Sequence, residues 1–226
     1  MENLKIAGYG KASGGNFEKV VITGYGSVSG DIITKEFSGS GNAKVSGAIA
    51  TGSLHYVGEV DVDSYIRANS IDITGQLRMN GDLLASIVNI TGGITSQGNY
   101  KGKSLMVTGT TQFLGDVSCD TFKVSGNTKI SGELCAEFVM IKSVSSKLNE
   151  IHAHQVEIKK QSISFKKANI YAEEIECTDI VAECLTCKKL CATNVKLAKT
   201  CVIDYLEYSG KLEMENGATV KEIVKL

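Results

Sequence analysis

Residues 122–134 read FKVSGNTKISGEL, in which apolar and polar residues alternate and Ser-Gly occurs twice, six residues apart. Both glycines of this stretch recur along the chain with a period of 17. The first column is Gly24, Gly41, Gly58, Gly75, Gly92, Gly109 and Gly126, and the second is Gly30, Gly47, Ser64, Gly81, Gly98, Gly115 and Gly132. A fixed period of this length indicates a tandem structural repeat.

Apolar residues keep the same step and alternate with polar ones, which is typical of β-strands. One column is Val20, Phe37, Leu54, Ile71, Val88, Leu105, Phe122, Val139 and Val156, and a second is Ile73, Ile90, Val107, Val124, Ile141, Ile158 and Ile175. A third is Ile32, Ile49, Ile66, Leu83, Tyr100, Val117, Leu134, Ile151, Ala168, Leu185 and Val202. A unit of this length suits one coil of a β-helix, with glycines at the corners. We therefore predict an all-β fold, a single-domain parallel β-helix over residues 1–226.

The composition changes along the chain without breaking this pattern. Proline is absent, so every residue can donate to a backbone ladder. All of the 24 glycines except Gly210 and Gly217 lie at or before Gly132, whereas most of the cysteines come later. The repeat predicts that Ser143, Lys160 and Cys177 continue the first glycine column. We interpret the chain as one solenoid with an N-terminal coil (1–19), glycine-cornered coils (20–135), glycine-poor coils (136–205) and a closing coil (206–226).

The charge and hydropathy of the chain exclude some partners. The formal net charge is -1, so no nucleic acid is expected as a partner. No segment approaches the roughly 20 apolar residues of a transmembrane helix, and the start, MENLKIAGYGKASGG, lacks the apolar core of a signal peptide. We expect a cytoplasmic protein whose thiols are reduced.

Besides the cysteines, three sets of residues are candidates for catalysis or binding. Gly8-Tyr-Gly10 and Gly24-Tyr-Gly26 lack the strand–GxGxxG–helix context of a dinucleotide loop, so we predict corner glycines. Carboxylates follow the second glycine and predict a solvated edge; the alternative is the acid pair of a β-helix enzyme acting on polysaccharide. These are Asp31, Asp82, Asp116, Glu133 and Glu150. His55, His152 and His154 are predicted at the surface; the alternative, the catalytic base of an acyltransferase with six-residue repeat units, conflicts with a step of 17.

The cysteines give the strongest chemical signal. Cys184 and Cys187 form a C-x-x-C, half of a zinc site, but no second pair follows at a suitable spacing. The repeat places Cys187 on the column of small residues that includes Ala136, and Cys184 beside Cys201 on the column of Asp116. We interpret the cysteines as structural thiols. The alternatives are a redox or cross-linking role and a metal site formed by Cys177, Cys184, Cys187 and Cys191. We therefore expect no metal, no cofactor and no catalytic residue, and the protein is not predicted to be an enzyme.

Both ends of the solenoid are predicted to be polymerisation surfaces. Strands at an open end present unpaired N–H and C=O groups, and capping by proline or a long helix is not expected here. The residues assigned to these ends are Leu4, Ile6, Ile223, Val224 and Leu226.

The chain resembles the bactofilins, the polymer-forming cytoskeletal proteins of bacteria, in particular those of Gram-positive type. Three stretches carry the resemblance: the start LKIAGYGKASGGNFEKVVITGYGSVSGDI, the repeated V-S-G-x-x-x-I-S-G-x-[LIV] coil, and the end YSGKLEMENGATVKEIVKL. The resemblance extends over essentially the whole chain, although residues 140–205 match by apolar columns only.

The resemblance implies a right-handed β-helix that assembles end to end into non-polar filaments without ATP or GTP. Its partners would be further copies of itself, a paralogous bactofilin, and bacterial proteins recruited to a scaffold for cell shape, envelope synthesis or motility. Some family members carry a short apolar membrane-targeting segment, which MENLKIAG matches poorly, so the inner face of the membrane is the alternative location. The alternative functions are a monomeric β-helix that binds a partner protein along one face, and a β-helix enzyme acting on polysaccharide or an acyl donor.

Overall fold

The computed structural model describes residues 2–161 and 168–226, and the strands within these residues form one sheet with parallel pairing. The strands are β1 (Glu2–Val45), β2 (Ile49–Val62), β3 (Ile66–Met79), β4 (Leu83–Ser96), β5 (Tyr100–Lys101), β6 (Ser104–Phe113), β7 (Val117–Ser143), β8 (Ser145–Lys160), β9 (Asn169–Ala182), β10 (Leu185–Leu197), β11 (Val202–Tyr208), β12 (Leu212–Met214) and β13 (Thr219–Lys225). Each coil between the two ends pairs with the coil before and the coil after it.

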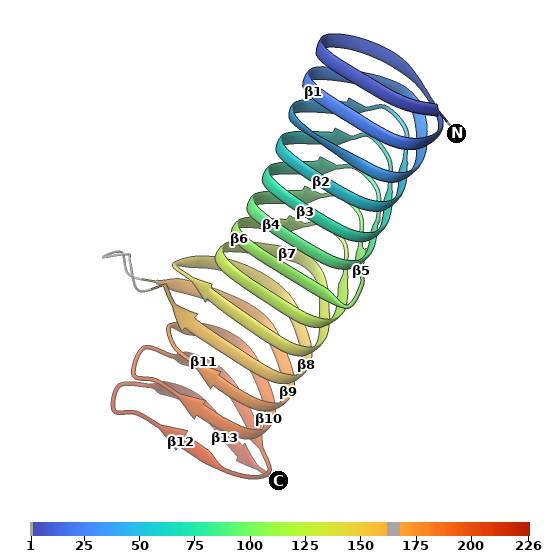
Figure 1. Cartoon of the computed structure of the whole chain (residues 1–226). Helices are drawn as coiled ribbons and strands as arrows, with labels where there is room; N and C mark the ends of the chain where they lie inside the picture. Colours follow the sequence, from blue (N-terminus) through green and yellow to red (C-terminus); the bar gives the residue numbers. More distant parts are fainter. Residues whose placement is uncertain (1, 162–167) are drawn as a thin grey trace.

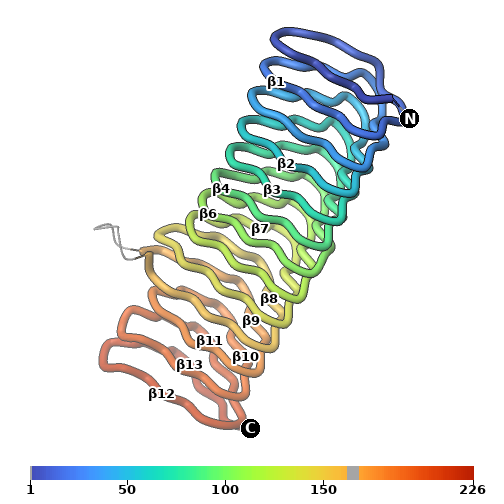
Figure 2. The backbone as a smooth tube through the Cα atoms, viewed as in Figure 1, coloured from blue at the N-terminus to red at the C-terminus, as the bar shows by residue number. Residues whose placement is uncertain are grey.

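The molecule is an elongated solenoid with its two termini at opposite ends (Figure 1). The backbone trace shows the coils stacked along one axis, with strand direction preserved from one coil to the next (Figure 2). This confirms the predicted parallel β-helix. No helix in the described part of the chain is long and apolar enough to cross a membrane.

The predicted step of 17 holds from Ile32 in β1 to Ile130 in β7. Ile32 pairs with Ile49, Ile49 with Ile66, and Ile66 with Leu83. The same column continues through Tyr100 to Val117. Because each pair joins positions one such step apart, the columns predicted over this range are confirmed.

Glycine at the first corner is required by both backbone conformation and space. Gly126 has φ +139, a region that residues with a Cβ avoid. A Cβ on Gly126 would overlap the carbonyl of Gly109 in the preceding coil. The glycine column therefore lets successive corners stack in direct backbone contact.

The columns predicted for the glycine-poor half are wrong after Ile158. Ile151 pairs with Ile175, although Ile175 was predicted to follow Ile158. Leu185 pairs with Ile170, and Val202 pairs with Thr186, so neither continues the column of Ile151. Ala168 lies just before β9 and is not on that column either. The cause is chain length: the step is 24 between β8 and β9, then 15 and 16 in the next two coils.

One apolar core runs through the stacked coils. Its largest side chains include Phe37 against Tyr56 and Tyr100 against Phe113, each pair with ring centroids 6.2 Å apart. The Tyr100 hydroxyl donates to the carbonyls of Ala85 and Ser104, at 3.2 and 3.0 Å. The core therefore continues from coil to coil instead of closing within one unit.

Candidate assembly surfaces

The C-terminal coil ends in two strands that are each paired on one side. β13 pairs with β11, and β12 pairs with β10. Among residues 2–161 and 168–226, no strand pairs with the outer edge of either. The backbone N–H and C=O groups on that edge are free to accept another strand.

Core-type residues occupy this outer edge. Ile223 continues the buried column of Leu190 and Leu206, both 0% exposed, yet Ile223 itself is 47% exposed. Met214 follows Leu197 on another column, and Met214 is 38% exposed whereas Leu197 is 0% exposed. Leu226 is 73% exposed. These side chains are exposed because no further coil within residues 2–161 and 168–226 covers them.

The other residues assigned to the ends differ in exposure. Leu4 is half-buried against the core, whereas Ile6 is buried at 6% exposure. Val224 lies on the outward-facing column of Cys191 and Glu207, so it does not extend the core. Leu4, Ile223 and Leu226 are therefore the predicted end residues with apolar surface available to a partner.

Two end residues were missed in the sequence, Leu212 and Met214. They pair with Val195 and Leu197, each one step of 17 earlier in the chain. The repeat step of 17 from Val195 and Leu197 predicts both residues. The column of Val156 could not be followed that far in the sequence, because the step between β8 and β9 is 24.

The cysteines occupy positions other than those predicted. Cys187 pairs with Ala172 and Ile203 on a buried column, not on that of Ala136. In the glycine-poor half, the cysteine on the small-residue column is Cys177, between Ala153 and Ala192, and it does not continue the column of Lys160. The unpredicted length between β8 and β9 accounts for both errors.

Cys184 is not stacked on Cys201. Its backbone N–H donates to Thr200 Oγ1 at 3.0 Å, and the Thr200 hydroxyl donates to Cys184 Sγ at 3.2 Å. Cys201 is buried and donates to the carbonyl of Ala182 at 3.2 Å. The one-residue offset follows from the step of 16 between β10 and β11.

The environments of Cys177 and Cys187 favour the neutral thiol. Burial raises the pKa of Cys177 and of Cys187 to about 12. Cys187 Sγ also donates to the carbonyl of Lys189 at 3.1 Å. Within the described residues, no group of three or more His, Cys, Asp or Glu side chains is placed to hold a metal ion.

The corner carboxylates serve the backbone of the next coil. Asp31 Oδ1 accepts from the N–H of Ala48 at 2.8 Å, and Asp116 Oδ1 accepts from that of Glu133 at 2.9 Å. Asp82 does the same for Asn99 at 2.8 Å. A Cβ on Gly132 would overlap Asp116 Oδ1, which explains the second glycine column. These aspartates satisfy corner N–H groups, and Glu133 and Glu150 sit side by side on successive coils.

His152 is the histidine with the closest ionisable neighbours. Its Nε2 lies 3.5 Å from Glu133 Oε1 and its Nδ1 lies 3.5 Å from Glu176 Oε2. Cys135, its neighbour on the preceding coil, donates to Glu133 Oε1 at 2.9 Å. The sequence reasoning missed this Cys135–His152 pair, although the two residues are one repeat step apart. Burial, with the hydrogen bond to Glu133 second, raises the pKa of Cys135 to about 11, so this thiol is a poor nucleophile. His55 lies 3.7 Å from Asp72, and His154 is exposed.

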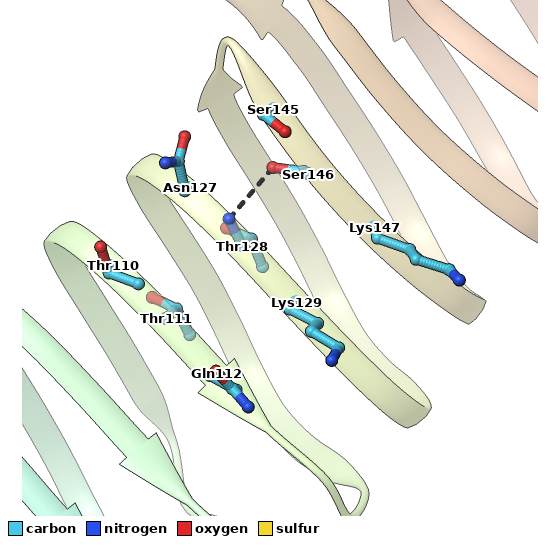
Figure 3. A pocket seen from close by; sticks show the side chains of 9 residues that line it. All are labelled: Thr110, Thr111, Gln112, Asn127, Thr128, Lys129, Ser145, Ser146 and Lys147. Atoms are coloured by element: carbon cyan, nitrogen blue, oxygen red, sulfur yellow. Dashed lines mark hydrogen bonds between the residues drawn. The ribbon is translucent and has the colours of Figure 1, made fainter.

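Figure 3 shows a pocket of about 220 Å³ beside the turn between β7 and β8. Ser146 Oγ accepts from the N–H of Thr128 at 3.2 Å and donates to Ser143 Oγ at 2.8 Å. The pocket is lined by Thr110, Thr111, Gln112, Asn127, Thr128, Lys129, Ser145, Ser146 and Lys147. None of these lining residues is a carboxylate, histidine or thiol. Ser146 instead hydrogen-bonds to two residues of β7, at a paired position where the step from Thr128 is 18.

Searches of protein-family models, of curated proteins and of solved structures found no match for this chain.

Proposed function

We propose that this chain is a polymer-forming scaffold of the bactofilin kind, which assembles end to end in the bacterial cytoplasm without nucleotide. The observation that carries the proposal is the C-terminal edge, where Met214, Ile223 and Leu226 expose apolar surface. On the same columns inside the rod, the residues equivalent to Met214 and Ile223 are buried.

Stacking another coil on this edge would gain free energy from two sources. Covering an exposed Ile or Leu side chain completely contributes about 1.5–3 kcal/mol. Each backbone hydrogen bond that continues the ladder adds about 1 kcal/mol net. Because one coil offers several of each, end-to-end contact can offset the association cost of about 4–15 kcal/mol.

The scaffold's partners would be further copies of the chain or a related bactofilin, and other proteins recruited along its sides. The glycine pairs that could have indicated nucleotide binding, at Gly8 and Gly24, are stacked corners. Polymerisation therefore needs no nucleotide in this proposal, and the filament would serve cell shape, the envelope or motility structures.

Negative-stain electron microscopy of the purified protein at low micromolar concentration, without nucleotide or metal, tests this proposal. We expect filaments from the unmodified chain and short rods from Ile223→Lys, because the lysine places a charge on the stacking edge. The matched control is Val57→Lys, since Val57 is 51% exposed on a lateral face and should still form filaments.

Filaments from Ile223→Lys at the same protein concentration as the unmodified chain would contradict this role of the C-terminal edge. Circular dichroism should show the same strand content in both variants, so that a loss of filaments reports on assembly and not on folding.

A second candidate function is a monomeric module that binds a partner protein along one face. Two surface hollows of about 390 and 550 Å³ share Lys101 and Gly102 and lie over the small-residue column that includes Ala85 and Ala136. An extended segment of a partner could lie along this lateral groove. Uniform short rods from the unmodified chain, at every concentration, would favour this candidate.

A further inference from the structure

The first and last coils present the same three columns. At the C-terminal edge, Leu212, Glu213 and Met214 follow Val195, Lys196 and Leu197. At the N-terminal edge, Tyr9 stacks on Tyr25 with ring centroids 5.1 Å apart, and Gly24 rests on the carbonyl of Gly8. This step of 16 places Leu4, Lys5 and Ile6 next to Val20, Val21 and Ile22.

These two sets are connected through the pairings along the rod. From Phe37 the first column runs through Leu54, Ile71, Val88, Leu105 and Phe122, and from Val139 through Val156, Ile180, Val195 and Leu212. The ion pairs Glu18–Lys35 and Lys19–Glu36 fix the step of 17 that leads from Val20 to Phe37. Leu4 and Leu212 are therefore the two ends of one inward column.

On the column just outside this one, the last two coils carry opposite charges. Lys196 and Glu213, on the last two coils, are joined at 3.0 Å. The residue that occupies this column on the first coil is Lys5, which is exposed and forms no ion pair with the described residues. A second copy continuing the stack beyond Glu213 would bring Lys5 beside it, in the order Lys196, Glu213, Lys5.

The apolar neighbours agree with this arrangement. Continuing the stack would place Leu4 on Leu212 and Ile6 on Met214, one aliphatic or thioether side chain on another. On a further inward column, Val220 ends a series that includes Cys187 and Ile203. Ala12 begins that series, because it lies two residues before Gly14, which stacks on Gly30 at the corner. Val220 and Ala12 are both partly buried against the core.

A two-fold contact does not produce these matches. In an isologous interface each edge meets a copy of itself, so Lys5 would face the N-terminal edge and Glu213 the C-terminal edge. Lys5 and Glu213 would then never meet. The complementarity is therefore specific to one relative direction of the two copies.

We propose that copies of this chain assemble head to tail, with the N-terminal coil of one copy continuing the parallel ladder of the C-terminal coil of another. The inference rests on the proposed end-to-end assembly and specifies its partner surface. It gives the filament a direction, in contrast to the non-polar filaments that the family resemblance implies. Lys5 and Glu213 form the inter-copy ion pair.

Charge exchange tests the pairing. We expect Lys5→Glu and Glu213→Lys each to raise the critical concentration for assembly about three- to tenfold, as for the loss and reversal of an exposed ion pair. The chain carrying both changes should return to within about twofold of the unmodified protein. Lys103→Glu, an exposed reversal in mid-rod, is the control and should leave the critical concentration unchanged.

Cross-linking tests the direction. Lys5→Cys and Glu213→Cys chains of different tag length are mixed, assembled and oxidised briefly, with the unmodified chain as a control for its own cysteines. Head-to-tail assembly predicts a mixed 5–213 dimer as the main new product. Dominant 5–5 and 213–213 dimers, or no rescue in the double charge variant, would overturn the head-to-tail inference while end-to-end assembly stands. An unmodified chain that remains as short rods would instead overturn the proposed function itself.

Discussion

Single residues at the corners hold one coil on the next. Gly126 brings its backbone against the Gly109 carbonyl, and Asp116 accepts a hydrogen bond from the N–H of Glu133. The backbone contact at Gly126 requires a residue without a side chain. The hydrogen bond from Glu133 requires a short side chain with an acceptor at position 116. Both requirements were visible in the sequence as columns, but the role of the aspartates was not, because a recurring carboxylate also fits a solvated edge.

At this scale we predict that Gly126→Ala destabilises the fold by about 1–3 kcal/mol, since φ +139 is costly for alanine. The added Cβ must also displace the Gly109 carbonyl. Urea unfolding of the assembly-blocked Ile223→Lys background measures the change. Ser125→Ala, one residue earlier, is the control and should shift the free energy of unfolding by less than about 0.5 kcal/mol. Equal effects of the two substitutions would contradict the corner explanation.

At the scale of the strand, alternation decides which residues enter the core. On β7, Val124 is buried and Lys123 is exposed, and both pair with the same neighbour strand, β6. A parallel solenoid buries the same columns in every coil. The burial of a residue on one strand therefore predicts the burial of the residues on the same column in neighbouring coils. The stability of each coil therefore depends on its own inward residues and on its two neighbours.

We predict that Val124→Asp destabilises the rod by at least about 3 kcal/mol, because the carboxyl group would enter a core without a partner. Thermal unfolding by circular dichroism in the same assembly-blocked background measures the effect. Lys123→Asp introduces the same aspartate side chain at the adjacent exposed position and should lower the free energy of unfolding by less than about 1 kcal/mol. Similar losses from both variants would mean that the inward–outward assignment of β7 is wrong.

The sequence predicts strand faces well and coil lengths poorly. Gly41 to Gly126 mark corners at a constant step, so the columns of β2 to β6 follow directly. After Ile158 no glycine marks the corner, and apolar residues seven apart, such as Ile151 and Ile158, are equally suitable partners for Ile175. The pattern cannot distinguish a step of 17 from one of 24. For this reason the core identity of Ile175 was predicted but its partner was not. For the same reason Cys187 was assigned to the small-residue column, which Cys177 occupies instead.

At the scale of the whole molecule, buried thiols and a buried tyrosine hydroxyl are distributed along the rod. Burial raises the pKa of Cys119 and of Cys187 to about 12, from an ordinary value of 9.0. It also raises the pKa of Tyr56 to about 12. Above pH about 9 the unfolded chain releases thiol protons that the folded chain retains, so alkaline conditions favour unfolding.

We therefore predict full stability below pH 9 and a progressive loss between pH 9 and 12, of about 1.4 kcal/mol per pH unit for each fully buried thiol. Urea unfolding of the Ile223→Lys background at pH 8 and pH 10.5, under reducing conditions, measures the slope. Cys119→Ala combined with Cys187→Ala should lose less stability over the same interval. An identical pH dependence in the double variant would show that these thiols are not the cause.

The hydrogen bonds of the corner aspartates have a direction, because the acceptor belongs to the earlier coil and the donor to the later one, as in Asp31 to Ala48 and Asp116 to Glu133. A chain leaving the ribosome emerges N-terminus first. At these aspartate corners the acceptor is therefore already in place when the donor N–H is synthesised, and the finished coil is a template for the next one. The rod can be built during translation, one coil at a time, without waiting for its far end.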